Sequence, residues 1–548
     1  MPLAGVGGFH TMAAVISRAA SFLLALGLLA PAAPAVPPAD TLLSSNEVAQ
    51  IITQALARAE RILPQATIAV ADREGYILGV WTLRTNLASF EAQLDLLDAM
   101  TKAGTASFLS SDEQAFTTRT AGFIVQQNFP PRIRNRSPGP LVGVNFSNLS
   151  FTDVNRFKNP HAGRDTNSTA GGTNGAPLSG VAAITGLAGS PGGVPLFRDG
   201  RLVGGVGVAG STRAPAGSPI PALADIQSRQ KYDQDEDVAL AGQAGFRPAR
   251  SIRGSRVLID GIRVPYVQSS PKRATPKPLG AVGQVVPGFE LTDSPLVAYP
   301  ELALGGQPCE VRAPIISDPA AGLIRGQARL QAGEVQQILA QASARARITR
   351  AGIRLPRGQA AQTFITVVNN PDQSNSFPVV LGTIRTPGAT LFSWDVSVQK
   401  ARTALFFSDD TRAFSSRSVG FLAQRFYPPG IADTSPGPFY GLQERFSLLP
   451  AGITNILNGV VLEADEALTT PNLNVPNGIT IFPGGFPLYR NGVLIGAIGV
   501  SGDGIDQDDL VAAAGTVGFL PPPAIRADEM SFHGARLPYA KFPRNPDL

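Results

Sequence analysis

The strongest constraint on the fold is that one sequence pattern occurs twice in this chain. Residues 192–211 and 484–503 are identical at 11 of 20 positions. Residues 102–131 and 400–429 are identical at 15 of 30 positions, and the tetrapeptide Ser-Pro-Gly-Pro follows each block. Two blocks repeated in the same order predict two copies of one structural unit.

The matches extend from Glu47 to Tyr266 in the first copy and from Glu334 to Tyr539 in the second. The chain has 548 residues, which is too long for one ordinary domain. Between the copies the sequence is rich in Pro, Gly and Ala and lacks periodicity, as is typical of a linker. We therefore expect module 1 at 40–267, a linker at 268–328, module 2 at 329–540 and a tail at 541–548.

The N-terminus has the pattern of a signal peptide. Arg18 precedes an apolar run over 21–30, and small residues lead to Ala35. The run is well short of the roughly 20 apolar residues of a membrane-spanning helix, so we expect no transmembrane anchor. Residues 1–35 are predicted to be a signal peptide cleaved after Ala35, which implies a periplasmic or secreted bacterial protein. A short N-terminal core helix is the alternative.

The periodicity of module 1 predicts alternating helices and hairpins. Apolar residues recur at helical spacing over 47–62, 92–108 and 116–129, and Pro130–Pro131 is expected to end the last of these helices. Residues 66–72 and 76–83 have the pattern of two strands, and Asp199–Gly200 and Asn491–Gly492 are typical of tight hairpin turns. Hairpins alternating with helices favour an antiparallel sheet covered by helices. The predicted fold class is an α+β sandwich, present twice.

Two sequence motifs typical of ligand-binding sites are matched only in part. Residues 205–210 match the glycine spacing of a dinucleotide-binding loop, but they lie within a predicted strand and no helix follows directly. We interpret these glycines as positions where a helix or a ligand approaches the sheet. The aspartates at 503, 506, 508 and 509 lack the spacing of a calcium loop, so we interpret them as helix-capping residues.

Basic residues and glycine turns kept in both copies are the candidate ligand-binding residues. Arginine offers a planar fork and lysine a point charge to an anionic ligand. The candidates are Lys102, Arg119, Gly192 and Gly193 in module 1, and Lys400, Arg417, Gly484 and Gly485 in module 2. Solvated or capping roles for the basic residues, and plain turns at the glycines, are the alternatives.

Histidine and cysteine are too rare for most catalytic or metal chemistry. The chain has three histidines, of which His10 leaves with the signal peptide, and one cysteine, Cys309. No cluster indicates zinc or a nucleophile–base triad, so we favour a protein that is not an enzyme. His161, in a polar loop, is the candidate iron ligand, whereas His533 aligns with Asp260 and is interpreted as a surface residue.

The formal net charge is +5, with Lys and Arg dispersed among Asp and Glu. This distribution argues against nucleic acid as the partner.

The strings over 398–407 and 483–502, followed by an Asp-rich start to an Ala/Gly-rich helix, resemble the GlcG/HbpS-like haem-binding family. The first copy is similar but more diverged. The resemblance implies a compact α/β module, profilin-like in build, which often assembles into oligomers. It also implies binding of haem or a related tetrapyrrole. This sequence departs from the family in its near absence of histidine, because no histidine occurs at matching positions of the two copies.

Two hypotheses follow. The first is an exported tandem-module protein that binds haem or a related tetrapyrrole. The alternative is a structural or partner-binding protein whose modules pair like a homodimer and hold no small-molecule ligand.

Overall fold

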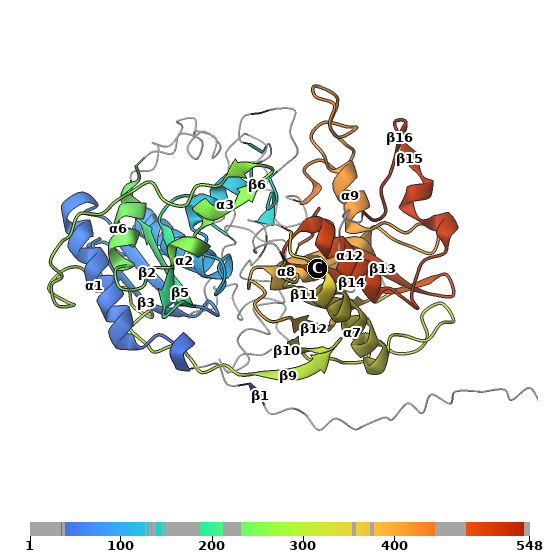
Figure 1. The fold of residues 1–548 in the computed structure, drawn as a ribbon, viewed down its shortest axis with the longest axis horizontal. Coiled ribbons are helices and arrows are strands. Elements are labelled where there is room, and N and C mark those ends of the chain that lie inside the picture. The colour runs from blue at the N-terminus through green and yellow to red at the C-terminus, as the bar shows by residue number, and fades with distance from the viewer. Residues whose placement is uncertain are drawn as a thin grey trace, which may run out of the picture.

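The computed structural model describes residues 34–35, 39–126, 129–130, 133, 139–144, 147, 187–211, 232–352, 358–372, 377–443 and 478–541. Figure 1 shows two α/β units side by side, with module 1 in blue and green and module 2 in yellow to red. The signal-peptide prediction lies almost wholly outside the described residues, as does the loop that contains His161.

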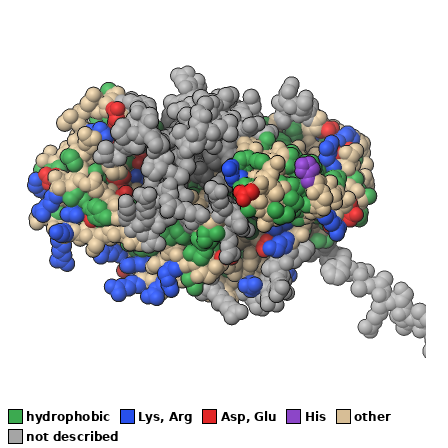
Figure 2. Space-filling view, turned by 90° about the horizontal axis from the view of Figure 1, so that it is seen from above, with side chains coloured by type: hydrophobic (Ala, Val, Ile, Leu, Met, Phe, Trp, Pro, Cys, Tyr) green, Lys and Arg blue, Asp and Glu red, His purple; other side chains and the backbone are tan. Residues whose placement is uncertain are grey.

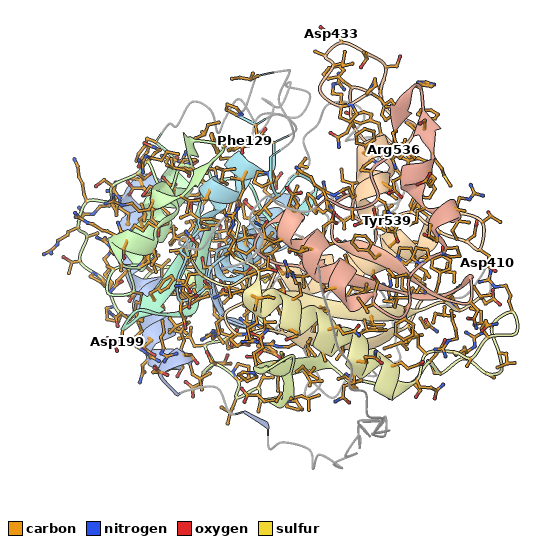
Figure 3. The ribbon with its side chains drawn as sticks, turned by 45° about the vertical axis from the view of Figure 1, so that its right-hand side comes forward. Phe129, Asp199, Asp410, Asp433, Arg536 and Tyr539 are labelled. Atoms are coloured by element: carbon orange, nitrogen blue, oxygen red, sulfur yellow. The ribbon has the colours of Figure 1, made fainter. Side chains whose placement is uncertain are left out.

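Module 1 is built on an antiparallel sheet. Its described strands follow the order β4-β5-β2-β3-β8 and are β2 (Thr67–Asp72), β3 (Ile77–Thr82), β4 (Gly193–Arg198), β5 (Arg201–Ala209) and β8 (Gln284–Val285). The β4–β5 turn is formed by Asp199 at φ 49° and Gly200 at φ 83°, as their sequence predicts for a tight hairpin. Figure 3 shows Asp199 at this tip, away from the other module.

Module 2 repeats this order and is extended at one edge. Its described strands follow the order β1-β9-β10-β12-β11-β14-β13, where β11 (Phe364–Asn369), β12 (Val380–Arg385), β13 (Gly485–Arg490) and β14 (Val493–Ser501) occupy the places of β2, β3, β4 and β5. Asn491 at φ 49° and Gly492 at φ 82° form the matching turn. Every named strand pair is antiparallel, which confirms the predicted sheet type.

Helices cover both faces of each sheet, so the fold is the predicted α+β sandwich. On one face of module 1 lie α1 (Ser45–Ile62) and α6 (Gln234–Gly242), and on the other lies α2 (Phe90–Phe108). In module 2 the same places belong to α7 (Ala332–Ile348), α12 (Ile505–Gly515) and α8 (Ser393–Phe406). Helix α1 begins at a capping box in which Ser44 and Glu47 bond each other's backbone N–H groups.

Glycines in the second strand of each hairpin bring α2 and α8 unusually close to the sheets. A Cβ atom at Gly207 would lie 2.1 Å from the carbonyl oxygen of Ala99 on α2. At Gly499 it would lie 2.0 Å from the carbonyl oxygen of Ser397 on α8. A helix therefore takes the place of a ligand at these glycines, which is one of the two alternatives expected for them.

The helix predicted over 116–129 is wrong in its limits. Helix α3 spans only Thr118–Ile124, and its counterpart α9 spans Ser416–Leu422. Beyond Ile124 the backbone changes partner, because Ile124 and Gln126 accept hydrogen bonds from Leu141 and Gly139. The helix therefore ends several residues before Pro130–Pro131, and a tertiary contact rather than proline stops it.

Residues 268–328, expected to be a linker, contribute strands to both sheets. β8 pairs with β3 of module 1. β9 (Tyr299–Leu304) and β10 (Gln307–Ala313) form a hairpin whose second strand pairs with β12 of module 2. Each sheet is thus extended at the same edge by a strand from the segment between the copies.

The two modules share an apolar core. One cluster of buried residues includes Phe108 of α2 together with Leu391 and Phe392, which precede α8. The N–H of Phe392 donates to the carbonyl oxygen of Phe108 at 3.3 Å, and the Gln443 side chain donates to the carbonyl oxygen of Gly143 at 2.6 Å. The modules are therefore packed against each other rather than merely tethered.

Candidate functional site

The eight candidate ligand-binding residues form two equivalent groups in space. Cluster 1 is Lys102, Arg119, Gly192 and Gly193, and cluster 2 is Lys400, Arg417, Gly484 and Gly485. Each lies where the buried helix α2 or α8 meets the start of β4 or β13 and the first turn of α6 or α12. The structure thus brings together residues that the sequence grouped only by repetition.

The lysine of each cluster is buried and bound to a carboxylate from the last helix of its module. Lys400 donates to Asp508 at 2.7 Å and to the carbonyl oxygen of Val500 at 2.8 Å, and its side chain is 1% exposed. Burial lowers the pKa of Lys400, and the carboxylate of Asp508 opposes this effect. The ammonium is therefore held inside the protein by its ion pair.

Lys102 has the same environment with one more carboxylate. Its Nζ lies 3.1 Å from Asp235 on α6 and 2.8 Å from Asp98, one turn earlier on α2. Burial raises the pKa of Asp235 to about 6, although Lys102 acts to lower it. The pKa of Asp235 is thus shifted toward neutral pH by its burial in cluster 1.

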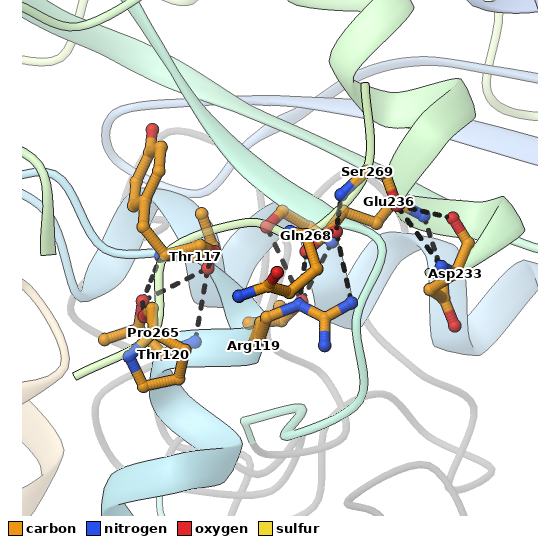
Figure 4. Close-up of polar contacts among 11 residues, drawn as sticks. Thr117, Arg119, Thr120, Asp233, Glu236, Pro265, Gln268 and Ser269 are labelled. Carbon is orange, nitrogen blue, oxygen red and sulfur yellow. Dashed lines mark hydrogen bonds and ion pairs between the residues drawn. The ribbon is translucent and has the colours of Figure 1, made fainter. Parts of the chain in front are cut away.

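The arginine of each cluster binds the acidic residue that directly follows the lysine's partner on α6 or α12. Arg119 binds Glu236 through Nε at 2.6 Å and Nη2 at 3.1 Å, and Glu236 also accepts from the backbone N–H groups of Gln268 and Ser269 (Figure 4). This bidentate pair ties α3 and α6 to the segment that follows module 1.

In cluster 2, Arg417 pairs with Asp509 and, at 2.5 Å, with Asp506. Burial alone would lower the pKa of Arg417, but the charge of Asp509 raises it. Burial raises the pKa of Asp509, against the opposing effect of Arg417. The geometry therefore presents both arginines as internal ion-pair partners.

The glycine pairs let the first strand of each hairpin pass directly beside the lysine. Gly192 has φ 123°, and a Cβ atom there would lie 2.8 Å from Cβ of Asp235. Gly484 has φ 114°, and its Cβ would lie 3.2 Å from Nζ of Lys400. Glycine is therefore explained by the structure at both positions, because no side chain fits and the backbone conformation disfavours other residues.

The capping role predicted for the aspartates at the start of α12 is wrong for Asp508 and Asp509. The residue at the cap of α12 is Gly504, which has no side chain to accept a bond. Asp508 and Asp509 instead bind Lys400 and Arg417, because those cations are buried beside the first turn of the helix. In module 1 a cap does exist, and Asp233 accepts from the N–H of Glu236.

The remaining candidates are scattered. His533 is exposed in the turn between β15 (Ser531–Phe532) and β16 (Ala535–Arg536), and its ring stacks on Phe532 with centroids 4.1 Å apart. The thiol of Cys309 on β10 lies 3.3 Å from the Ser343 hydroxyl, and burial raises its pKa. Within the described ranges, no group of three His, Cys, Asp or Glu residues is placed to hold a metal ion.

Sequence reasoning missed a second charged cluster, between the modules. Glu74, in the β2–β3 turn, binds Arg312 of β10 at 2.6 and 3.0 Å. Arg312 also binds Glu310, and its Cζ atom lies 3.7 Å from the centroid of the Tyr299 ring. Arg385 of β12 lies 3.3 Å from Glu310. We call Glu74, Glu310, Arg312 and Arg385 the junction cluster.

The charges of the junction cluster stabilise one another. Burial acts to raise the pKa values of both glutamates, but Arg312 and Arg385 together outweigh it, so the pKa of Glu74 is lowered and that of Glu310 falls to about 2. The sequence showed only a turn at Glu74–Gly75, because its partner is 238 residues away.

One family model matches part of module 2. Residues 346–516 match the family model described as haem degrading protein HbpS-like. No curated protein matches the chain. The chain is similar to the crystal structure of a PduOC–haem complex, with 21% identity over 35% of this chain and 96% of that one and a TM-score of 0.22.

Two further solved structures are similar to the same extent. The protein ORFY of Klebsiella pneumoniae has 21% identity over 36% of this chain and 96% of its own, with a TM-score of 0.22. A double mutant of HbpS from Streptomyces reticuli has 16% identity over 37% and 96%, with a TM-score of 0.20. Among the helices of the described residues, none is long and apolar enough to cross a membrane.

Proposed function

We propose that this protein binds haem or a related tetrapyrrole. The observation that carries the proposal is the match of residues 346–516 to the HbpS-like family model, whose description refers to haem. The match includes Lys400, Arg417, Gly484 and Gly485 and ends at Thr516, directly after α12. The proposal therefore assigns ligand binding first to module 2.

The described residues of cluster 2 do not form a cradle for the propionates of haem. Lys400 and Arg417 already face carboxylates, and the side chain of Lys400 is 1% exposed. Gly485 lies against the carbonyl oxygen of Lys400, so the space beside the strand is filled. Cluster 2 is better suited to holding α8, α9, β13 and α12 in place, and its role in contacting a ligand stays a prediction.

Haem would supply iron, which imidazole nitrogen readily ligates. After residue 35 the chain has two imidazoles, His161 and His533. His161 lies outside the described residues, and His533 is exposed beside two aromatic rings, those of Phe532 and Tyr427. Either side chain has the chemistry of an axial ligand, and the two are distinguished by substitution.

The test is a titration of the full chain with haemin, followed by absorption spectroscopy and calorimetry. We expect a shifted Soret band with saturable heat, and loss of the shift in one of the variants His161→Ala and His533→Ala. Absence of both signals in the unaltered protein would overturn the proposal. A Soret shift retained in the double variant His161→Ala/His533→Ala would leave haem binding intact and reject histidine ligation.

A second candidate function is a structural or partner-binding role in which the two modules replace a homodimer. The observation that favours it is the junction cluster, which joins module 1 to module 2 through four buried or half-buried charges. Modules expressed separately should then associate when mixed, as measured by analytical ultracentrifugation. If neither associates with nor stabilises the other, the pairing role is rejected.

We further propose that the protein is exported and cleaved after Ala35. In the structure β1 (Pro34–Ala35) pairs with Tyr299 and Pro300 of β9, so cleavage would free that edge. N-terminal sequencing of the protein from its native host should begin at Val36. Recovery of the uncleaved chain from the cytoplasm would contradict export.

A further inference from the structure

Module 1 carries an unbalanced basic surface on a unit that is nearly neutral in module 2. The unit follows the last helix of each module and consists of two short 3-10 turns and a hairpin. In module 1 it comprises η3 (Arg250–Ile252), η4 (Gly254–Arg256), β6 (Leu258–Ile259) and β7 (Ile262–Arg263). In module 2 it comprises η6 (Pro523–Ile525), η7 (Ala527–Glu529), β15 and β16.

The two units have the same backbone. Each is joined to its module by a parallel bridge, Ala115 with Arg253 in module 1 and Ala413 with Arg526 in module 2. Each hairpin turns at a residue with positive φ, Asp260 at 50° and His533 at 46°. The position of each side chain in one unit can therefore be compared with its counterpart 273 residues later.

The charges of the two units differ although the backbone does not. Residues 247–268 contain five arginines and one aspartate, whereas residues 520–541 contain three cationic and two acidic residues. Arg256 in module 1 corresponds to Glu529 in module 2, and Ser255 corresponds to Asp528. The fold does not require the basic residues, because the same backbone forms with acids in their place.

Ion pairing follows the same contrast. In module 2, Arg526 binds Asp528 at 2.6 Å and Arg536 lies 3.8 Å from Glu529. In module 1, no carboxylate of the described residues forms an ion pair with any of the five arginines, Arg247, Arg250, Arg253, Arg256 and Arg263. All but Arg253 are exposed. Figure 2 shows Lys and Arg side chains at the surface of both halves of the molecule.

The surface continues along the chain beyond the hairpin. Lys272 and Arg273 are exposed and no acidic residue lies between Asp260 and Glu290. The Arg263 side chain donates to the carbonyl oxygen of Ser255 at 2.5 Å, which places Arg263 of β7 beside the residue that precedes Arg256 in η4. The charge pattern taken to be dispersed over the whole chain is therefore concentrated locally.

We propose that this surface docks on a membrane that carries anionic phospholipid headgroups. Guanidinium groups match phosphate oxygens in geometry and charge, and exposed Lys and Arg near an anionic bilayer each add about 1 kcal/mol of attraction. Leu258, an aliphatic side chain that is 55% exposed, lies between Arg256 and Arg263 in the sequence, and its counterpart in module 2 is Ser531. Arginines flanking an exposed aliphatic residue suit the boundary between headgroups and acyl chains.

Nucleic acid fits this surface less well. Binding of single strands relies on exposed aromatic rings for stacking. Tyr266, three residues after the hairpin, is only 5% exposed and lies under Arg253, whose guanidinium is 5.7 Å from its ring centroid. The surface therefore offers charge and an aliphatic contact but no stacking platform.

The test is cosedimentation of the full chain with vesicles of phosphatidylcholine alone or mixed with phosphatidylglycerol. We expect binding to the mixed vesicles only, and release in about 1 M NaCl, where screening acts over roughly 3 Å. Changing Arg250, Arg256 and Arg263 together to Ser should weaken the binding roughly a hundredfold. The matched control is Arg536→Ser, at the position equivalent to Arg263, and it should leave binding unchanged.

Two further variants guard against misfolding. Arg256→Glu and Leu258→Glu test charge and the aliphatic contact separately, and Arg256→Glu copies the residue that module 2 already holds there. Each should reduce binding while the thermal unfolding curve stays that of the parent. Equal binding to both kinds of vesicle, or unchanged binding in the triple variant, would overturn the proposal. So would binding to duplex DNA or an acidic protein without binding to vesicles.

Discussion

At the scale of single residues, the pairing of buried charges is the main feature that the repeated sequence does not reveal. Repetition of Lys102 as Lys400 and of Arg119 as Arg417 marked these cations, but not their partners. Apart from Asp98, which lies one helical turn before Lys102, their carboxylates lie more than 85 residues away in sequence, as at Arg417 and Asp506. Repetition in both copies predicts that these residues are important, whereas only the fold shows what each one binds.

Removing the buried lysine of cluster 2 should destabilise module 2. Lys400→Met leaves Asp508 without its cation at a site where the Asp508 side chain is 4% exposed. We expect the free energy of unfolding to fall by about 3–5 kcal/mol, as for other buried pairs that lose one partner. Urea unfolding followed by the fluorescence of Trp394, on the same helix, measures the change.

The control for this experiment is the double variant Lys400→Met/Asp508→Leu. It removes both charges together, so most of the lost stability should return. If both variants unfold at the urea concentration of the parent, the ion pair contributes nothing and cluster 2 has another purpose.

Asp72 predicts a dependence of stability on pH. It is buried at the end of β2, and burial raises its pKa from 3.8 to about 7. The folded state then binds a proton more tightly than the unfolded state, so the stability contributed is present below pH 3.8 and is lost as pH rises toward about 7. Comparing urea midpoints of the parent and Asp72→Asn across this range should show a flatter profile in the variant.

The aspartate-to-asparagine change separates the pH dependence due to Asp72 from that due to Asp235, whose pKa is also raised, to about 6. Asparagine keeps the Oδ1 atom that accepts from the N–H groups of Glu74 and Tyr76. Parallel profiles for parent and variant would contradict the assignment.

At the scale of elements, periodicity predicted the helices and strands well where each element satisfies its own backbone. Helix α1 carries its own capping box and a continuous apolar face, so its limits of 45–62 are close to the predicted 47–62. Helix α3 ends early because residues 139–141 bond the carbonyls beyond Ile124. An element is predictable from local sequence only when its ends are decided locally.

The junction cluster predicts a strong effect at Arg312. Its side chain is 1% exposed, and Arg312→Met leaves Glu74 and Glu310 facing Arg385 alone. We expect a loss of about 3–5 kcal/mol in the free energy of unfolding. The fluorescence of Trp81 and of Trp394 reports on modules 1 and 2 respectively, and both transitions should shift together.

A matched control is Arg412→Met, which breaks an exposed pair with Asp409 at 2.9 Å. Exposed pairs contribute at most about 1 kcal/mol, so this variant should unfold close to the parent. A similar loss in both variants would show that the burial of Arg312 has no special effect.

At the scale of the whole molecule, the segment between the copies is part of both sheets. β10 covers the edge of β12, so a module 2 fragment that begins at residue 329 exposes an unpaired strand. Exposed edges promote association between chains. We expect a fragment of residues 329–541 to aggregate and a fragment of residues 295–541, which keeps β9 and β10, to be more soluble and more stable to urea.

Size-exclusion chromatography of both fragments at matched concentration measures this difference. Identical elution and identical urea midpoints would show that β10 is a passive attachment to the sheet.

The sequence by itself determined the repetition, the α+β class, most helices and strands, and the tight turns, because periodicity, capping and turn residues act over a few neighbours. It also identified the residues of clusters 1 and 2, since both copies retain them. Only the tertiary structure decided that these cations are paired, that α2 and α8 fill the space above the glycines, and that the linker builds sheet. Those outcomes depend on contacts between residues far apart in the chain, which no local pattern records.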